Sequence, residues 1–434
     1  MMWYSTSDPQ HRVSFREAVL KGLAPAQGLY MPERIPQLPA TFFERAPALT
    51  FQEQAFEIAH AFLREDVAQP LLRTMVERTL TFDAPLVAIE PNVFALELFH
   101  GPTLAFKDVG ARFMAQLLGH YAQEIKQEIV VLVATSGDTG GAVANGFYQV
   151  PGVRVVVLYP SKKVSELQEK QFTTLGHNVA AIEVEGTFDD CQRLVKAAFA
   201  DPDLTEKFFL TSANSINVGR LLPQVFYYVY AWSRAPRNTS IVFSVPSGNF
   251  GNVMAGLLAQ QMGLPDVRFI AATNVNDVVP AYLQSGSFEP RPSTATISNA
   301  MDVGNPSNFT RILELFGHDH QKIKSVITGC AFTDAETANA MRLIFQQRNY
   351  MLDPHGAVAY LGLKQHRHNH ETGIFLETAH PAKFKEVVEH VLQTNVKIPD
   401  ALQAYQNKNK KSINAAPDFE DVKQKIATIL STKT

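Results

Sequence analysis

Five short runs of almost entirely apolar residues, rich in Val and Ile, constrain the fold of this chain more than any other feature of its sequence. They lie at residues 128–134, 153–158, 241–245, 268–272 and 373–377. A strand with one face in water alternates apolar and polar residues, whereas a strand buried on both faces is apolar nearly throughout. The runs therefore predict strands of a mainly parallel sheet that is covered by helices on both faces.

Segments with helical spacing of apolar residues lie between and after these runs. Residues 189–199 and 334–347 each place their apolar side chains on one face, and residues 419–430 form a third amphipathic segment. Strands that alternate with helices imply right-handed crossovers, so the sequence predicts an α/β fold with open, mainly parallel sheets. The first 92 residues differ, since they are rich in proline and in short helical patterns, and we predict a small, mostly helical N-terminal domain there.

Composition limits the functional classes. The 434 residues carry a formal net charge of −3, so no attraction to nucleic acid or to an anionic membrane is expected. We expect no membrane span, because no apolar stretch of about 18 residues occurs, and no signal peptide. Two cysteines are too few for a disulfide framework or a structural zinc site, which favours a cytoplasmic protein.

Three strand ends carry residues suited to binding. In open α/β sheets ligands bind at the carboxyl ends of the strands. There the sequence has TSGDTGG at 135–141, PSGNFGN at 246–252 and ETAHPAK at 377–383. The first two expose backbone N–H groups at a helix start, as a phosphate or carboxylate requires. Each is also compatible with an ordinary capped turn.

Lys107 is the candidate for covalent chemistry. It follows Leu104, Ala105 and Phe106 in the run HGPTLAFKD at 100–108, whereas most other lysines have polar neighbours. A lysine that attaches a carbonyl-bearing cofactor must be largely unprotonated and desolvated. A surface lysine paired with Asp108 explains the same local pattern.

Taken together, these motifs resemble those of bacterial and fungal threonine synthases. The matching runs cover nearly the whole chain and occur in order: VSFREAV at 13–19, LFHGPTLAFKD at 98–108, ATSGDTG at 134–140, NSINVGR at 214–220, VPSGNFG at 245–251, AATNVND at 271–277, NAMD at 299–302 and TAHPAKF at 378–384. The resemblance implies the tryptophan-synthase-β-like fold of type II pyridoxal-phosphate (PLP) enzymes. It also implies a threonine-synthase N-terminal domain at 1–92, a catalytic region at 93–400 with a smaller mobile α/β domain inserted at about 110–215, and a C-terminal helical extension at 401–434.

The resemblance also implies roles for individual residues. Lys107 is similar to the family's Schiff-base lysine, and Thr378 is similar to the residue that contacts the pyridine nitrogen. The other residues implied to bind the cofactor are Asp138, Gly248, Asn249, Phe250, Gly251 and Asn252. Those implied to bind the substrate are Ser136, Gly137, Thr139, Asn214, Ser215 and Arg220. No metal is implied.

The activity that the resemblance implies is the last step of threonine biosynthesis. Phosphate leaves O-phospho-L-homoserine by γ-elimination and water adds at Cβ, which yields L-threonine. Lys107 would act as the general base, and Arg220 would assist the departing phosphate. We expect a small-molecule substrate and a monomer or homodimer.

Two other interpretations remain open. Another type II PLP enzyme, such as a threonine or serine dehydratase or a cysteine synthase, shares the fold but lacks the N-terminal domain and the 214–220 motif. A non-catalytic protein that binds PLP or phosphorylated metabolites would not need an intact Lys107.

Overall fold

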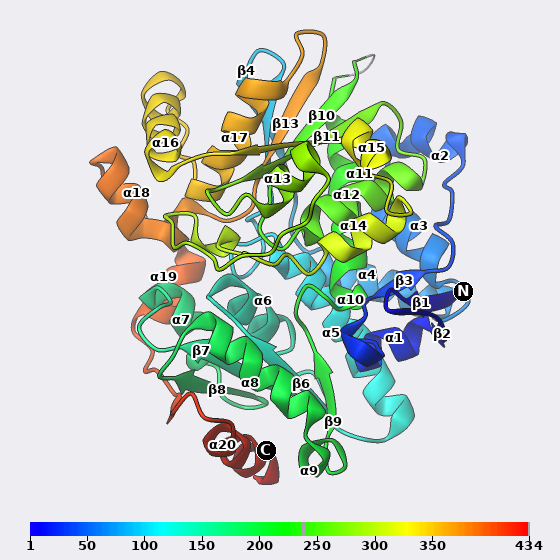
Figure 1. The fold of residues 1–434 in the computed structure, drawn as a ribbon, viewed down its shortest axis with the longest axis vertical. Coiled ribbons are helices and arrows are strands. Elements are labelled where there is room, and N and C mark those ends of the chain that lie inside the picture. Colours follow the sequence, from blue (N-terminus) through cyan, green and yellow to red (C-terminus); the bar gives the residue numbers. More distant parts are fainter. Residues whose placement is uncertain (237–238, 433–434) are drawn as a thin grey trace.

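The computed structural model describes residues 1–236 and 239–432, and within these ranges the strands form three sheets (Figure 1). The largest sheet has six strands, which are parallel to their neighbours except for the antiparallel pair β4 and β5. In spatial order its strands are β12 (Ile327–Ala331), β11 (Val267–Thr273), β10 (Ile241–Pro246), β13 (Thr372–Glu377), β5 (Val93–Glu97) and β4 (Leu86–Glu90).

A second sheet has five strands, all parallel to their neighbours. Its strands, in spatial order, are β14 (Ile413–Ala415), β8 (Val179–Val184), β7 (Val153–Pro160), β6 (Ile129–Ala134) and β9 (Phe209–Ser212). In Figure 1 this sheet lies in the lower half of the molecule and the six-stranded sheet lies in the upper half. The mainly parallel α/β fold predicted from the sequence is confirmed.

All five predicted strands are present, as β6, β7, β10, β11 and β13. Strand β6 shows why their sequences are apolar throughout. Val131 and Val133 pack into the large central core, whereas Val130 and Leu132 pack into a separate cluster beneath α8 (Phe188–Ala200) and α20 (Phe419–Ser431). Both faces of the strand are buried, so it lacks the polar face that gives a half-exposed strand its alternating pattern.

The three predicted amphipathic helices are confirmed as α8, α16 (Asp334–Arg348) and α20. Helix α17 (Pro354–His366) packs on β10, β11 and β13 of the large sheet. Shorter helices of this part of the chain are α6 (Asp138–Gly146), α7 (Glu166–Thr173), α13 (Val278–Ser285), α14 (Phe309–Leu315), α15 (His320–Val326), α18 (Lys385–Leu392) and α19 (Asp400–Gln406).

The N-terminal segment combines helices with a small sheet that the sequence analysis did not predict. The antiparallel sheet contains β2 (Asp8–Ser14), β1 (Met2–Ser5) and β3 (Tyr30–Pro32). The helices are α1 (Phe15–Lys21), α2 (Ala40–Arg45), α3 (Phe51–Leu63) and α4 (Gln69–Thr79). These strands are short and the longest of them, β2, is largely polar, so their sequences carry little of the apolar pattern that identifies a buried strand.

The C-terminal segment contributes a strand as well as helices. Strand β14 pairs with β8 at the edge of the five-stranded sheet. Helix α20 follows, and the buried Arg154 side chain of β7 donates hydrogen bonds to the carbonyl oxygens of Leu430 (2.9 Å) and Ile429 (3.0 Å). These contacts satisfy helix-terminal carbonyls and hold α20 against the sheet. The division of the chain into domains at 92 and 400, with the insertion at about 110–215, stays a prediction.

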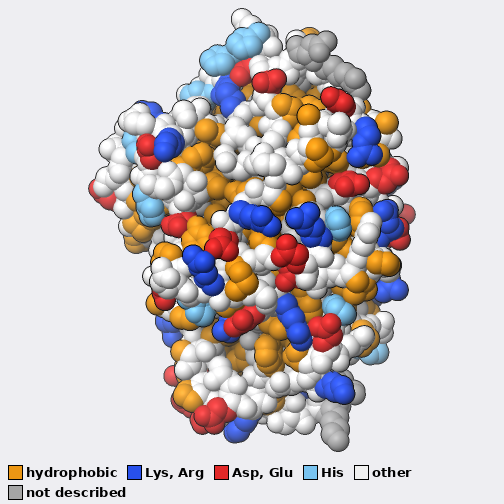
Figure 2. Space-filling model, turned by 90° about the vertical axis from the view of Figure 1, so that its right-hand side faces the viewer, with side chains coloured by type: hydrophobic (Ala, Val, Ile, Leu, Met, Phe, Trp, Pro, Cys, Tyr) orange, Lys and Arg blue, Asp and Glu red, His pale blue; other side chains and the backbone are white. Residues whose placement is uncertain are grey.

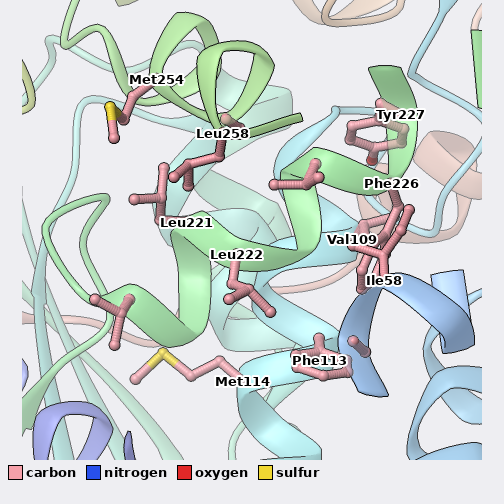
Figure 3. Packing of buried hydrophobic residues seen from close by; sticks show 14 of the residues in the cluster. Ile58, Val109, Phe113, Met114, Leu221, Leu222, Phe226, Tyr227, Met254 and Leu258 are labelled. Carbon is pink, nitrogen blue, oxygen red and sulfur yellow. The ribbon is translucent and has the colours of Figure 1, made fainter. Parts of the chain in front are cut away.

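A packed group of helices brings the predicted site residues together. Helix α5 (Lys107–Ile125) contacts α10 (Val218–Leu221), and α10 and α11 (Val225–Arg234) contact α12 (Gly251–Gln261). Figure 3 shows Leu221 facing Met254 and Leu258 of α12, with Leu222 on the side of Phe113 and Met114 of α5. Because Lys107 begins α5, Arg220 lies in α10 and Gly251 begins α12, this apolar contact sets their relative positions.

On the face drawn in Figure 2, acidic and basic side chains are interspersed. Among the described residues no helix is both long enough and apolar enough to cross a membrane.

Candidate active site

A cavity of about 290 Å³ lies where strand ends of the two larger sheets face each other. Residues that follow β6, β9, β10 and β13 line it, together with the first residue of α5, as expected for the carboxyl edge of parallel strands. The predicted site residues that line it are Lys107, Ser136, Thr139, Asn214, Ser215, Arg220, Gly248, Asn249, Phe250, Gly251, Asn252 and Thr378. Gly137 and Asp138 are not among its lining residues.

The backbone around Lys107 is held by contacts from two other parts of the chain. The N–H of Phe106 donates to the carbonyl oxygen of Thr378 at 2.9 Å, and the hydroxyl of Tyr227 donates to the carbonyl oxygen of Phe106 at 2.9 Å. Leu104 adopts a left-handed conformation (φ 57°), which turns the chain into α5. Thr378 is therefore fixed beside Lys107, as a cofactor contacting both residues would require.

The electrostatic surroundings favour the neutral amine of Lys107. Burial lowers its pKa, and the carboxylate of Asp138 opposes this shift. The positive charges of Lys383 and Arg220 lower the pKa further. The Nζ atom lies 3.9 Å from Asp138 Oδ2, and 18% of the side chain is exposed. Lys107 is thus desolvated but reachable from the cavity, the combination that a nucleophilic lysine needs.

Asp138 faces a second lysine, which the sequence analysis did not single out. Lys383 Nζ lies 2.8 Å from Asp138 Oδ1, and Gln168 donates to the same oxygen at 2.9 Å. Burial by itself raises the pKa of Asp138, but the two lysines outweigh it and hold that pKa well below its usual range. Asp138 is therefore an ionised, buried carboxylate in this structure.

The turn between β6 and α6 places two hydroxyls in the cavity. Thr135 Oγ1 accepts hydrogen bonds from the N–H groups of Gly137 (3.0 Å) and Gly140 (2.8 Å). Gly137 has a φ of 141°, a backbone conformation that residues with a side chain rarely adopt. A Cβ at this position would also lie 2.8 Å from the Gln168 side chain. This geometry turns Ser136 and Thr139 toward the cavity and Asp138 away from it.

The loop at 247–252 has the geometry of a phosphate cradle. It leads into the N-terminus of α12, where backbone N–H groups and the helix dipole favour an anion. A Cβ at Gly248 would lie 2.8 Å from Met301 Cα and 2.9 Å from the carbonyl oxygen of Ala300, so only glycine fits. The Nδ2 group of Asn252 is buried and has no hydrogen-bond partner among the described residues. An unsatisfied donor beside this loop fits a cofactor phosphate.

Arg220 supplies a second, separate positive charge in the cavity. Its side chain is almost fully buried, and burial lowers the pKa of its guanidinium to about 10, so it stays a cation near neutral pH. Its Nη1 donates to the carbonyl oxygen of Ala213 at 2.5 Å, and its Nε has no partner among the described residues. Nearby, Asn214 Nδ2 donates to the carbonyl oxygen of Ala134 at 3.1 Å. This segment can receive an anionic group.

Several cavity residues carry no recognisable local sequence signal. His355 lines the cavity, and its Nε2 accepts a hydrogen bond from the N–H of Ala300 at 3.2 Å while Asp353 contacts its Nδ1 at 2.6 Å. Arg291, from the segment before Asn299, lies at the same cavity as Asp189 of α8. For Lys383 a signal exists, because it lies between Ala382 and Phe384, an apolar context like that of Lys107.

Comparison with known families gives three matches that together span most of the chain. Residues 73–375 match the family of pyridoxal-phosphate dependent enzymes, residues 2–80 match the threonine synthase N terminus, and residues 356–426 match the threonine synthase C-terminal family. The first match covers well over half of the chain.

Individual relatives agree with these matches. The chain is 47% identical to threonine synthase of Haemophilus influenzae, over 93% of this chain and 94% of that protein. It is 46% identical to threonine synthase of Escherichia coli, over 96% of this chain and 97% of that protein.

Solved structures give the same result. The crystal structure of threonine synthase from Escherichia coli matches with a TM-score of 0.94 at 45% identity, over 99% of this chain and all of that one. A PLP-bound threonine synthase from Brucella melitensis matches with a TM-score of 0.93 at 32% identity, over the full length of both chains. A threonine deaminase from Solanum lycopersicum, at 15% identity and a TM-score of 0.55 over 74% of this chain and 94% of its own, shares the fold alone. The chain therefore belongs to the threonine synthase family of pyridoxal-phosphate-dependent enzymes.

Proposed function

We propose that this protein is a PLP-dependent threonine synthase, which converts O-phospho-L-homoserine and water to L-threonine and phosphate. The observation that carries the proposal is a single cavity that combines Lys107 with two separate sites for anions, the loop at the start of α12 and Arg220. A phosphorylated cofactor and a phosphorylated substrate need two such sites at once. A dehydratase or a cysteine synthase does not act on a phosphorylated homoserine and would not need the second one.

The residues that would hold the cofactor lie on two strand ends of the large sheet. Gly248, Asn249, Phe250, Gly251 and Asn252 would bind its phosphate, since the loop offers backbone donors and the unpaired Nδ2 of Asn252. The Thr378 hydroxyl would meet the pyridine nitrogen. When bound, the cofactor withdraws electrons from the carbon atoms of an attached amino acid and makes their protons removable.

Lys107 would attach the cofactor and would then move protons on the substrate. Its Nζ is reachable from the cavity, and its lowered pKa favours the amine that can accept the proton on Cα. The same atom can return a proton to Cγ after phosphate has left. We propose that Asp138, predicted to bind the cofactor, keeps the region around Nζ negatively charged.

The substrate would lie between the hydroxyl turn and the Arg220 segment. Ser136 and Thr139, with the backbone at Gly137, would bind the substrate carboxylate. Asn214, Ser215 and Arg220 would bind its phosphate, and the guanidinium would stabilise the charge that grows on phosphate as its bond to Cγ breaks. Because both anion sites open into one cavity, the reacting carbons would be held next to Lys107.

We also propose that the inserted domain at about 110–215 moves toward the large sheet when substrate binds. Its residues Phe188, Asp189 and Gln192 line the cavity together with Arg291 and Ser293, so a closing motion would exclude bulk water until the addition step. Solution X-ray scattering with a non-hydrolysable phosphonate analogue should show a smaller radius of gyration than the unliganded enzyme. An unchanged radius would contradict closure.

The direct test follows the oxygen atoms of the reaction. In water labelled with heavy oxygen, the protein should release phosphate without label and threonine that carries the label in its hydroxyl group, since the Cγ–O bond breaks and water adds to Cβ. A phosphatase would instead release labelled phosphate and unlabelled homoserine. Either of those products, or phosphate without threonine, would contradict the proposal.

A cytoplasmic enzyme fits the sequence, and we propose this location. Both cysteines, Cys191 and Cys330, are buried and unpaired, so the described chain contains no disulfide that would require an oxidising compartment. Light scattering of the purified protein would test the expected monomer or homodimer, and a larger assembly would contradict it.

A further inference from the structure

Lys383 is a buried lysine that shares one carboxylate with Lys107. It lies in the short turn Pro381–Phe384, just after β13 and Thr378. Its side chain is fully buried, with an exposed fraction of 0%, and its Nζ lies 2.8 Å from Asp138 Oδ1. Lys107 approaches the other oxygen of the same carboxylate at 3.9 Å. One carboxylate therefore faces two lysines, and the one outside the cavity is closer.

This arrangement weakens the electrostatic effect of Asp138 on the protonation of Lys107. A buried carboxylate next to a single lysine stabilises the ammonium form of that lysine, which cannot attack a carbonyl or accept a proton. Lys383 compensates most of the negative charge of Asp138, because it is the closer partner and is fully withdrawn from water. The charge of Lys383 also lowers the pKa of Lys107 directly.

Other charged groups near Lys107 do not replace this effect. Arg220 also lowers the pKa of Lys107, but its Nη1 is bound to a backbone carbonyl and it belongs to the proposed phosphate site. Asp108 follows Lys107 in α5 and is buried. Its carboxylate accepts hydrogen bonds from the N–H (2.9 Å) and the hydroxyl (2.5 Å) of Thr103, so it is engaged away from Lys107.

Lys383 also contacts the turn that leads into Lys107. Its Nζ donates to the carbonyl oxygen of Thr103 at 2.7 Å. Thr103 in turn holds Asp108, the residue after Lys107. The Lys383 side chain thus connects the turn at 101–106 with the start of α6, where Asp138 lies, and fixes the distance between Lys107 and Asp138.

We propose that Lys383 is a positioning residue for the reaction: it binds Asp138 from outside the cavity and so leaves Lys107 free to react as an amine. The proposal rests on the proposed function, since it assumes that Lys107 attaches the cofactor. Lys383 is not among the residues that line the cavity, so it would act through Asp138.

The test uses the holoenzyme without substrate. The visible absorbance of the bound cofactor, followed against pH, reports protonation of the nitrogen that Lys107 supplies. Lys383→Met removes the charge and nearly keeps the length of the side chain. In this variant the midpoint pH of the absorbance change should rise by about 1 pH unit or more, since Asp138 then stabilises the protonated form. Lys383→Arg, the matched control, keeps the charge and should stay closer to the wild type. Equal midpoints for Lys383→Met and wild type would overturn the proposal.

A second pair of variants removes the Asp138 carboxylate itself, because that carboxylate loses its closest partner in Lys383→Met and the unpaired charge destabilises the fold. In Asp138→Asn the cation of Lys383 remains uncompensated, so the midpoint should fall below the wild type. Adding Lys383→Met to that variant should raise the midpoint again by about 1 pH unit. Identical midpoints for the single and the double variant would overturn the proposal, because a purely structural lysine would not affect the titration.

These titrations are independent of the substrate. If the midpoints shift as expected but O-phospho-L-homoserine is not converted, the proposed function fails and the role of Lys383 stands. If the substrate is converted and the midpoints do not move, the role of Lys383 fails alone.

Discussion

The Nδ2 group of Asn249 donates a 2.6 Å hydrogen bond to the hydroxyl oxygen of Ser215. Asn249 belongs to the loop proposed to hold the cofactor phosphate, and Ser215 belongs to the segment proposed to hold the substrate phosphate. The Oδ1 atom of Asn249 also accepts a hydrogen bond from the N–H of Ser307 at 2.6 Å. One side chain thus connects the two anion sites, and changes at either site are expected to be felt at the other.

This link predicts coupling between Ser215 and Asn249. Ser215→Ala should raise the KM for O-phospho-L-homoserine and should also weaken PLP binding, because Asn249 loses the acceptor that orients it. Asn249→Ala should mainly weaken PLP binding. In a double-mutant cycle the two losses of PLP affinity should fall short of additivity by about 1 kcal/mol, the value of one hydrogen bond. Strictly additive losses would show that the contact carries no coupling.

Lys107→Ala should abolish the visible absorbance of the cofactor and lower turnover by roughly 1000-fold or more, since attachment and proton transfer are both lost. The fold should persist, because 18% of the side chain is exposed to the cavity and its Nζ makes no hydrogen bond within the described residues. Circular dichroism and the melting temperature measure this. Lys163→Ala, at an exposed site, serves as the control and should keep both absorbance and activity. Turnover that survives in Lys107→Ala would remove Lys107 from the mechanism.

Arg220→Lys should reduce kcat/KM for the phosphorylated substrate by roughly 100-fold, since an ammonium replaces a planar guanidinium that can bind phosphate with two donors. The inhibition constant of inorganic phosphate should rise in parallel, whereas the affinity for PLP should change little. Steady-state kinetics with phosphate as inhibitor measure both constants. An unchanged inhibition constant would place the substrate phosphate elsewhere.

Gly248→Ala should weaken PLP binding by about 10-fold or more, because its new Cβ would meet backbone atoms of Ala300 and Met301 at under 3.0 Å and the loop would have to shift. Gly251→Ala is the matched comparison. Its Cβ would approach only side-chain atoms, the nearest being Asn308 Nδ2 at 3.3 Å, which can move. Equilibrium titration of PLP into the cofactor-free variants ranks them, and a larger loss for Gly251→Ala would contradict this account.

The stability of the protein should depend on His380 in mildly acidic solution. Burial lowers the pKa of His380 to about 4, and its Nδ1 accepts a hydrogen bond from the N–H of Ala382 at 3.1 Å, which only the neutral ring can do. The unfolded chain binds the proton first, at a pKa near 6.5, so folding stability is lost as pH falls from about 6.5 toward 4. At pH 4.5 this residue alone lowers the free energy of unfolding by about 2–3 kcal/mol.

His380→Asn offers the matched test. Asparagine can accept the same hydrogen bond from Ala382 but does not titrate. Urea unfolding at pH 7 and at pH 4.5 should therefore show that acidification lowers the free energy of unfolding less in His380→Asn than in the wild type. Equal losses in the two proteins would show that His380 is not the group responsible.

Local patterns predicted five of the strands that are buried on both faces, which are β6, β7, β10, β11 and β13. The apolar runs at 128–134 and 241–245 indicated covered strands, and the loops after them were expected at the carboxyl edge of a parallel sheet. The family resemblance added Lys107 and Thr378 to the loop at 248–252 as parts of one site, and all of them line the cavity. The N-terminal sheet and the strands β4, β5, β8, β9, β12 and β14 were not predicted, because short strands are stabilised by partners distant in sequence and carry little periodicity of their own.

By itself the sequence determined which segments are buried and which loops can bind anions, because burial and turn geometry depend mainly on the local residue types. Only the tertiary structure decided which way each side chain of those loops faces. The turn at 135–140 sends Ser136 and Thr139 into the cavity, and it sends Asp138 toward Lys383, which lies in a distant part of the chain. The electrostatic potential at Lys107 depends on that long-range contact, because electrostatic interactions depend on distance in space and not on separation along the sequence.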